Sequence, residues 1–116
     1  MLSVLSKDLV AASATPLVLG ILAGGDSYGY AIIRDIRDRS RGTLEWTEGM
    51  LYPVLHRLEA QGLVVARWEG EEGERRRKYY RITDEGRAAL AALLAQWRAV
   101  DEAVEAIAGG KRDVRT

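Results

Sequence analysis

The 116-residue sequence contains no cysteine and a single histidine, His56. Without cysteine the chain cannot form a disulfide framework, a thiolate metal site or a cysteine nucleophile. The lone histidine has no second histidine to pair with as a metal ligand, so it does not indicate a metal centre either. We therefore expect neither a metal nor another cofactor.

Catalytic motifs are also missing. The sequence has no nucleophile–base pair, no glycine-rich phosphate loop followed by lysine, and no pair of carboxylates in a recognisable pocket setting. A chain of this length is expected to form one small domain, which leaves little room for a catalytic site beside the structural positions. We therefore do not expect an enzyme.

Long hydrophobic runs are absent as well. The longest charge-free stretch, residues 9–25, contains Ser13 and Pro16 and falls short of the ~20 strongly apolar residues that a membrane span requires. A signal peptide carries net positive charge ahead of its apolar run, whereas Lys7 is followed at once by Asp8. These features predict a soluble cytoplasmic protein without a membrane partner.

The chain has no excess of charge of either sign, because 17 basic residues balance 17 acidic ones. A general electrostatic argument for binding a polyanion is therefore missing. The charge is nevertheless segregated within RWEGEEGERRRKYYRIT, residues 67–83, where four glutamates precede three arginines and a lysine. Any contact with DNA must come from such a local cluster.

The N-terminal part of the chain is expected to be helical. Thr15 and Pro16 indicate a helix start, with Thr15 as the N-cap and Pro16 at the first helical position, where its missing N–H has no cost. This helix is expected to stop at residues 24–25, which are both glycine. Residues 2–13 form a possible separate short helix ahead of it, because their apolar positions share one stripe.

Two more helices are expected before residue 62. Residues 26–27, Asp-Ser, are taken as the cap of the second helix, and Thr47 as the N-cap of the third. Trp46, just ahead of that cap, is expected in the core, packed on the first residue of the apolar stripe of the third helix. This stripe recurs at helical spacing and consists of Leu51, Val54, Leu55 and Leu58.

Residues 63–70 and 75–83 are expected to form two strands joined by a glycine-rich acidic turn. Alternation places Tyr80 and Ile82 on one face and a mainly basic set on the other: Arg75, Arg77, Tyr79 and Arg81. Trp68 is expected to pack at the root of this ribbon. A tip this acidic is poorly suited to enter a minor groove, so the returning strand is the expected contact with DNA.

A last helix is expected to begin after Thr83, its N-cap, with acidic residues in the first turn. Its apolar residues alternate in steps of three and four, a narrow seam typical of one helix packing on another. The simplest partner is the same helix of a second copy, which predicts a homodimer. The expected interface residues are Leu90, Leu93, Trp97, Val100, Val104 and Ile107.

The order helix, helix, helix, strand, strand, helix predicts a winged helix-turn-helix, mainly α with a small β-hairpin. In this layout the second helix supports the third, which lies in the DNA major groove. The chain then divides into a winged helix-turn-helix domain over residues 1–83, a dimerisation helix over residues 84–108 and a flexible tail over residues 109–116.

Three stretches resemble the PadR family of bacterial transcription regulators: LVLGILAGGDSYGYAIIRDI, TEGMLYPVLHRLEAQGLV and RRRKYYRITDEGRAAL. The most specific part is LYPVLHRLEAQGLV, in which a Tyr-Pro pair lies inside the third helix. The resemblance implies a homodimer that binds double-stranded DNA at a palindromic operator, most often as a repressor. It also implies release by a small effector, which for several members is a planar aromatic compound.

The exposed N-terminal face of the third helix is the expected DNA-reading surface, because a helix start attracts phosphate and its side chains reach base edges. The start of the second helix and the basic strand add contacts to phosphates. The residues expected to contact DNA are Ser27, Tyr28, Thr47, Gly49, Tyr52, His56, Arg57, Arg75, Arg76, Arg77 and Lys78. Alternatively, Tyr52 packs under the wing and Arg57 pairs with Glu59 or Asp38. Core packing is expected for Tyr30.

Trp97 and Asp101 form the candidate effector site, with Trp97 next to its counterpart near a two-fold axis and Asp101 as a polar handle. The alternative is that Trp97 simply packs in the helix interface. Two other interpretations stay open for the whole protein. One is a winged-helix protein–protein module without DNA binding, which the neutral charge favours; the other is a regulator without an effector.

Overall fold

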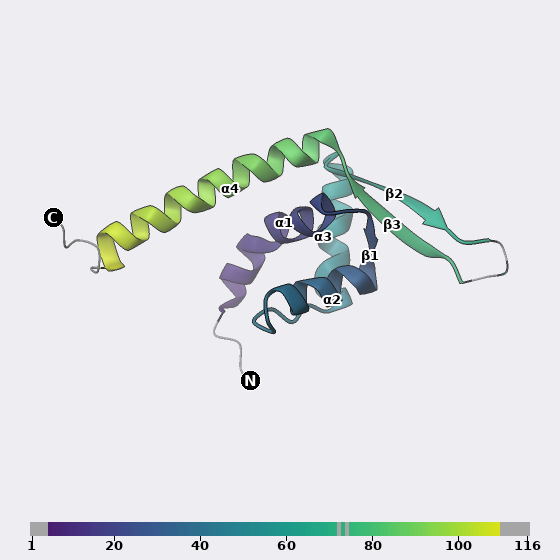
Figure 1. The fold of residues 1–116 in the computed structure, drawn as a ribbon, viewed down its shortest axis with the longest axis horizontal. Helices are drawn as coiled ribbons and strands as arrows, with labels where there is room; N and C mark the ends of the chain where they lie inside the picture. The colour runs from purple at the N-terminus through teal and green to yellow at the C-terminus, as the bar shows by residue number, and fades with distance from the viewer. Residues whose placement is uncertain (1–4, 72, 74, 110–116) are drawn as a thin grey trace.

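The computed structural model describes residues 5–71, 73 and 75–109 of the chain. Figure 1 shows a body built from α1, α2 and α3, with a β-ribbon leaving it on one side and α4 on the other. Of the tail expected over residues 109–116, residue 109 is the last residue of a helix and the others lie outside the described residues. The elements in chain order are α1 (Lys7–Ala23), β1 (Ser27–Tyr28), α2 (Gly29–Arg39), α3 (Glu48–Ala60), β2 (Val64–Glu69), β3 (Arg77–Ile82), α4 (Asp84–Val104) and the π-helix η1 (Glu105–Gly109).

The mainly helical fold with a small sheet is confirmed, but the sheet contains a strand that the sequence did not indicate. β2 and β3 pair antiparallel from Val64–Ile82 to Glu69–Arg77, as expected for the ribbon. β1 adds to the other side of β3, which makes a three-stranded sheet of order β1-β3-β2 within the described residues. The prediction that residues 26–27 cap the second helix is therefore wrong: α2 begins after Tyr28. A two-residue strand is too short to show alternation, and its partner lies far along the chain.

The first helix also differs from the prediction. α1 is continuous and begins after Ser6, whose Oγ accepts a hydrogen bond from the N–H of Leu9 at 3.1 Å. Pro16 lies inside this helix and Thr15 is not its N-cap. An internal proline costs roughly 3 kcal/mol. We attribute the continuity of the helix to the burial of the face around Pro16, which offsets this cost: Ala14, Val18, Leu19 and Leu22. In the part of the chain that is described, no helix is both long and apolar enough to cross a membrane.

The core lies where α1, α2 and α3 meet the root of the sheet. The predicted stripe of α3 is buried, Trp46 is 5% exposed, and Tyr80 and Ile82 enter the core from β3, all as expected. They belong to one cluster whose other members come from α1, α2 and β2. This cluster therefore holds α3 against α2 and the ribbon, which sets the geometry of the candidate site.

The start of α4 is fixed closely to the end of α3. The Oγ1 of Thr83 accepts from the N–H of Gly86 at 3.0 Å and donates to the carbonyl of Gly62 at 2.7 Å. A methyl group at Gly86 would overlap the carbonyl oxygen of Leu63, so only glycine permits this close approach. Thr47 caps α3 in the same way, its Oγ1 accepting from the N–H of Met50 at 3.3 Å. Both threonine caps are confirmed.

The exposure of the α4 seam increases along the helix. Leu90 is half-buried and packs against the core cluster. Farther along, Trp97 is 37% exposed, Val100 58%, Val104 53% and Ile107 85%. In this single copy of the chain, the distal half of α4 therefore carries a row of large apolar side chains that the body does not cover.

Candidate nucleic-acid interface

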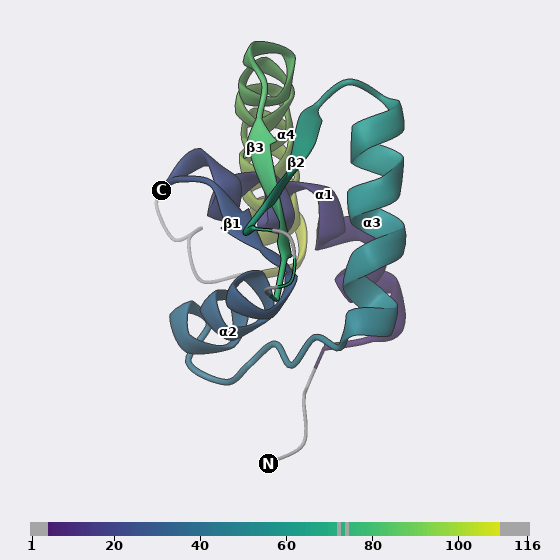
Figure 2. The ribbon, with the colours of Figure 1, turned by 90° about the vertical axis from the view of Figure 1, so that its right-hand side faces the viewer.

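A groove of about 600 Å³ separates the ribbon from the N-terminal ends of α2 and α3. Figure 2 looks onto the ribbon end of the molecule, where α3 stands beside the ribbon and α2 lies below it. Four cationic side chains and one carboxylate, that of Glu48, are among the lining residues: Tyr28, Gly29, Tyr30, Glu48, Tyr52, Trp68, Arg75, Arg76, Arg77 and Lys78. Positive charge therefore gathers beside two helix N-termini, which also favour anions.

The exposed face of α3 presents several of the residues expected to contact DNA. Thr47, Gly49 and His56 are exposed at the start and middle of the helix. Arg57 is exposed as well, and its Nη1 donates a hydrogen bond to Oγ1 of Thr15 on α1 at 3.2 Å. This bond, rather than a pair with an acidic neighbour, orients the guanidinium in the structure. All four of these positions are therefore accessible to a large partner.

Tyr52 packs against the start of α2 and lines the groove. It is half-buried, and a methyl group added to the buried Gly29 would overlap its Oη. Gly29 is therefore needed for the close approach between α2 and α3. The ring centroid of Tyr52 lies 6.4 Å from that of His56, one turn farther along α3. This arrangement agrees with the packing alternative for Tyr52, although the ring still borders the groove.

Three residues, Ser27, Tyr30 and Trp68, lie differently from what the sequence suggests. Ser27 is 8% exposed, because β1 turns its side chain towards the core, so its hydroxyl does not line the groove. Tyr30 is 65% exposed rather than buried, because Ala31 and Ile32 occupy the inward face of α2. Trp68 is 58% exposed and lies near the outer end of the ribbon rather than at its root. Tyr28 is half-buried, with its ring edge-on to that of Tyr79 at 5.2 Å.

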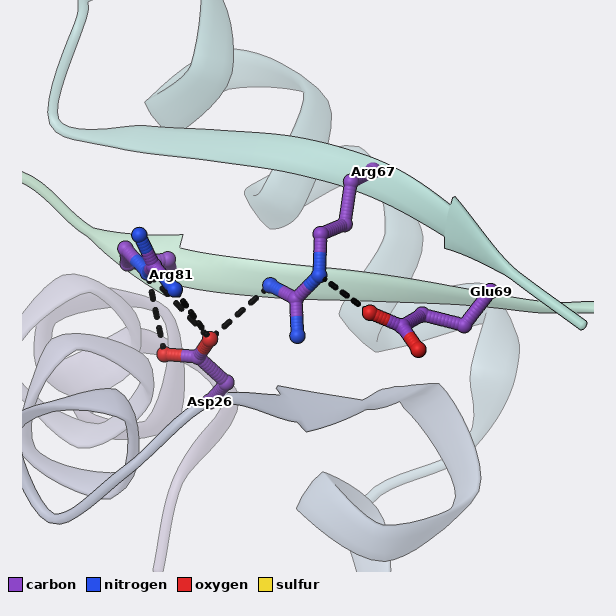
Figure 3. A network of polar contacts seen from close by, with 4 residues as sticks. All are labelled: Asp26, Arg67, Glu69 and Arg81. Atoms are coloured by element: carbon purple, nitrogen blue, oxygen red, sulfur yellow. Dashed lines mark hydrogen bonds and ion pairs between the residues drawn. The ribbon is translucent and has the colours of Figure 1, made fainter.

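Two arginines of the sheet are neutralised by carboxylates (Figure 3). Asp26 binds Arg67 at 2.8 Å and Arg81 at 3.1 Å, and Arg67 also binds Glu69 at 2.6 Å. The hydrogen bond from Arg81 is the largest cause that lowers the pKa of the Asp26 carboxyl below its ordinary value. A lowered pKa means that this network stabilises the fold at neutral pH and loses that contribution as the pH falls through the folded-state pKa. The network joins the segment before β1 to β2 and β3.

This network was not identified from the sequence, although part of its signal was there. Alternation within residues 77–82 places Arg81 on the outer face of the ribbon. The missing information was the position of Asp26, which depends on the unpredicted strand β1. Sequence patterns do not show which arginines of a basic segment are already paired.

The residues proposed for an effector lie away from this groove. Trp97 and Asp101 are on the distal half of α4, which Figure 1 shows on the opposite side of the body from the ribbon. Asp101 is exposed. A second apolar surface lies between α1 and the start of α3, a groove of about 590 Å³. Its lining includes Lys7, Val10, Ala14, Leu44, Glu45, Trp46, Met50, Val54 and Arg57.

Known proteins with the same architecture were found by sequence and by structure. Residues 18–92 match the model of the transcriptional regulator PadR-like family. A transcriptional regulator of Mycobacterium tuberculosis is 41% identical over 75 residues, 65% of this chain and 66% of that protein. A transcriptional regulator from Clostridium thermocellum superposes with a TM-score of 0.83 at 32% identity, over 90% of this chain and 99% of the other. PadR of Bacillus subtilis, solved in complex with operator DNA, gives a TM-score of 0.63 at 25% identity, over 69% of this chain and 45% of the other.

The family model covers more than half of the chain, and the winged-helix order, the threonine-capped α3 and the groove beside it lie within or next to the matched residues. The protein therefore belongs to the PadR-like family of transcriptional regulators.

Proposed function

We propose that the protein represses transcription by binding a palindromic operator as a homodimer, with α3 in a major groove and the ribbon along the flanking backbone. The observation that carries this proposal is the groove beside α3. Four cations from Arg75 to Lys78 line it, next to the N-terminal ends of α2 and α3. A phosphate backbone lying there would meet both the side-chain charges and the free N–H groups of the helix starts.

We assign recognition of the DNA base sequence to the exposed face of α3. His56 and Arg57 are long enough to reach base edges, while Thr47 and Gly49, at the helix start, suit a phosphate contact. The hydrogen bond from Arg57 to Thr15 would have to open or be shared for Arg57 to reach a base. Ser27 is left out of the proposed contacts because its side chain is buried.

The dimer is assigned to α4. The exposed row of Trp97, Val100, Val104 and Ile107 is too apolar to stay in water when a second copy can cover it. We pair the distal half of α4 with the same helix of a second copy, so that the two apolar rows cover each other.

An effector that releases DNA is assigned to the same helix. Two large rings of Trp97 near a two-fold axis are hard to pack without a gap, and such gaps accept flat apolar ligands. We expect planar aromatic compounds to quench the fluorescence of Trp97. Because the chain contains three tryptophans, the Trp97→Phe variant serves as the control and should lose the ligand-dependent part of the signal. A flat titration across a varied panel would favour simple packing of Trp97.

The central test is binding of labelled duplex DNA. The purified protein is expected to bind a duplex from the region upstream of its own gene more tightly than a scrambled duplex of equal length. Specific binding typically exceeds non-specific binding by roughly 10³-fold or more, so anisotropy titrations at fixed salt resolve the difference. The alternative function, a winged-helix protein–protein module, predicts no binding to either duplex even at low salt.

A further inference from the structure

Trp68 occupies an unusual position on the ribbon. On one face of the sheet the cross-strand pairs run outwards as Val64–Ile82, Ala66–Tyr80 and Trp68–Lys78. Val64, Ile82 and Tyr80 are at most 5% exposed, whereas Trp68 is 58% exposed. The third pair therefore lies past the edge of the core, and the tryptophan ring lines the groove beside α3. Core packing does not account for a large ring at this place.

The ring of Trp68 instead contacts a cation. The guanidinium carbon of Arg76 lies 5.7 Å from the Trp68 ring centroid, within the range of a cation–π contact. The next two residues along the chain lie on rings in the same way: Arg77 on Tyr28 at 4.5 Å, and Lys78 on Tyr80 at 5.6 Å. Three successive cations are thus held by aromatic faces.

Five basic residues on β2, on β3 or just before β3 therefore fall into two groups. Arg67 and Arg81 are bound to carboxylates, which neutralise them and occupy their N–H groups. Arg76, Arg77 and Lys78 form no ion pair with a carboxylate of the described residues. A cation on a ring keeps its full charge, and the N–H groups at the edge of a guanidinium stay free to bind phosphate.

We propose that Trp68 is a positioning residue for DNA binding: its ring holds Arg76 extended over the groove, ready to meet a backbone phosphate. The physical reason is conformational freedom. An arginine side chain that is already ordered loses less entropy when it binds phosphate than one that is free in solution. Trp68 would then increase affinity through Arg76, without contacting a base. This inference rests on the proposed DNA-binding function and adds a residue to it.

Other roles for Trp68 predict different results. If the ring contributed mainly to the fold, its loss would lower the melting temperature, which is not expected for a side chain this exposed. If the ring contacted DNA itself, its loss would weaken binding even when Arg76 is absent. A double-mutant cycle between Trp68 and Arg76 therefore separates positioning from direct contact.

The experiment measures affinity for a random-sequence duplex of about three helical turns, ~30 base pairs, over a series of salt concentrations. Such a duplex suffices because phosphate contacts do not depend on sequence. The variants are Trp68→Leu, Trp68→Tyr, Arg76→Gln and the double variant Trp68→Leu/Arg76→Gln. Val65→Ala is the matched control, since Val65 is 50% exposed on the opposite face of the same strand.

Trp68→Leu is expected to weaken binding about 3- to 10-fold, the effect of leaving one long side chain unordered. Its salt dependence should stay unchanged, because the same cations still meet phosphates. Arg76→Gln should weaken binding and, unlike Trp68→Leu, reduce the slope of log affinity against log salt by about 0.9, the value for one phosphate contact. The double variant should match Arg76→Gln alone, while Trp68→Tyr and Val65→Ala should stay close to the unmodified protein.

Additive effects of the two substitutions, or unchanged affinity of Trp68→Leu, would overturn the positioning role while leaving the proposed function intact. A large fall in melting temperature for Trp68→Leu would also overturn it, in favour of a structural role. If the unmodified protein binds no duplex at low salt, the proposed function itself fails, and this inference fails with it.

Discussion

Replacing Arg75, Arg76 and Lys78 together with glutamine is expected to weaken binding to every DNA duplex by a similar large factor. All three side chains line the groove beside α3. A hydrogen bond to a charged group contributes about 1.5–3 kcal/mol, and about 1.4 kcal/mol corresponds to a tenfold change in affinity. Loss of three such contacts therefore lowers affinity by on the order of 1000-fold at low salt.

The salt dependence gives a sharper measurement than the affinity. If each of the three cations meets one phosphate, the slope of log affinity against log salt should fall by about 2.7, because one phosphate accounts for about 0.9. Anisotropy titrations of an operator duplex and a scrambled duplex over several salt concentrations measure both slope and specificity. A loss confined to one sequence would contradict contact with the backbone and indicate base reading instead.

Arg81→Gln is a suitable control for this experiment. It removes one positive charge from β3, the strand that also carries Lys78, and Arg81 is exposed. Its guanidinium, however, is already bound to Asp26 at 3.1 Å and does not line the groove. We expect a much smaller loss of affinity from this substitution. Because the triple substitution removes three charges, a loss one third as large on a logarithmic scale would mean that total charge, rather than position in the groove, determines binding.

Val104→Asp is expected to convert the protein to monomers. Val104 is 53% exposed in the single chain, so the substitution should leave the monomer fold intact. In a dimer seam, however, it would bury an unpaired carboxylate, which costs roughly 3–5 kcal/mol, or more than 100-fold in the dimer dissociation constant. Because two linked half-sites gain roughly 100- to 10,000-fold in avidity, binding to a palindromic operator should fall by a similar factor.

Sedimentation velocity measures the first effect, and titration of a palindromic and a half-site duplex measures the second. Ala95→Asp provides the matched control, since residue 95 is exposed and lies on the opposite side of α4 from Val104 at 100° per residue. We expect this control to remain dimeric. A Val104→Asp protein that sediments as an unchanged dimer would refute the assignment of α4 to the interface.

Local features of the fold could be predicted from the sequence because their causes are local. Thr47 and Thr83 bind N–H groups three residues away, so the caps depend on short segments of chain. The alternation that buries Tyr80 and Ile82 follows from strand geometry, and the stripe of α3 follows from helix geometry. The seam of α4 is visible in the same way, although which surface covers it depends on a second molecule.

Pro16 and Asp26 show where local signals gave the wrong answer. A proline after threonine is a common helix start, yet α1 runs through Pro16, because burial of the surrounding face depends on contacts with the rest of the core. Asp26 followed by serine suggests a helix cap. The pairing of β1 with β3 instead places Asp26 beside Arg67 and Arg81, and no local pattern reports that pairing.

The sequence by itself determined the winged-helix order, the apolar faces of α3 and α4 and the presence of a basic segment, since each is set by spacing along a short stretch. Only the tertiary structure decided which charges of that segment are available. It pairs Arg67 and Arg81 with carboxylates, and it places Arg76 on the exposed ring of Trp68 at the edge of the groove. These contacts join residues from separate elements, so they exist only after the core has fixed β1, α2 and α3 against the ribbon.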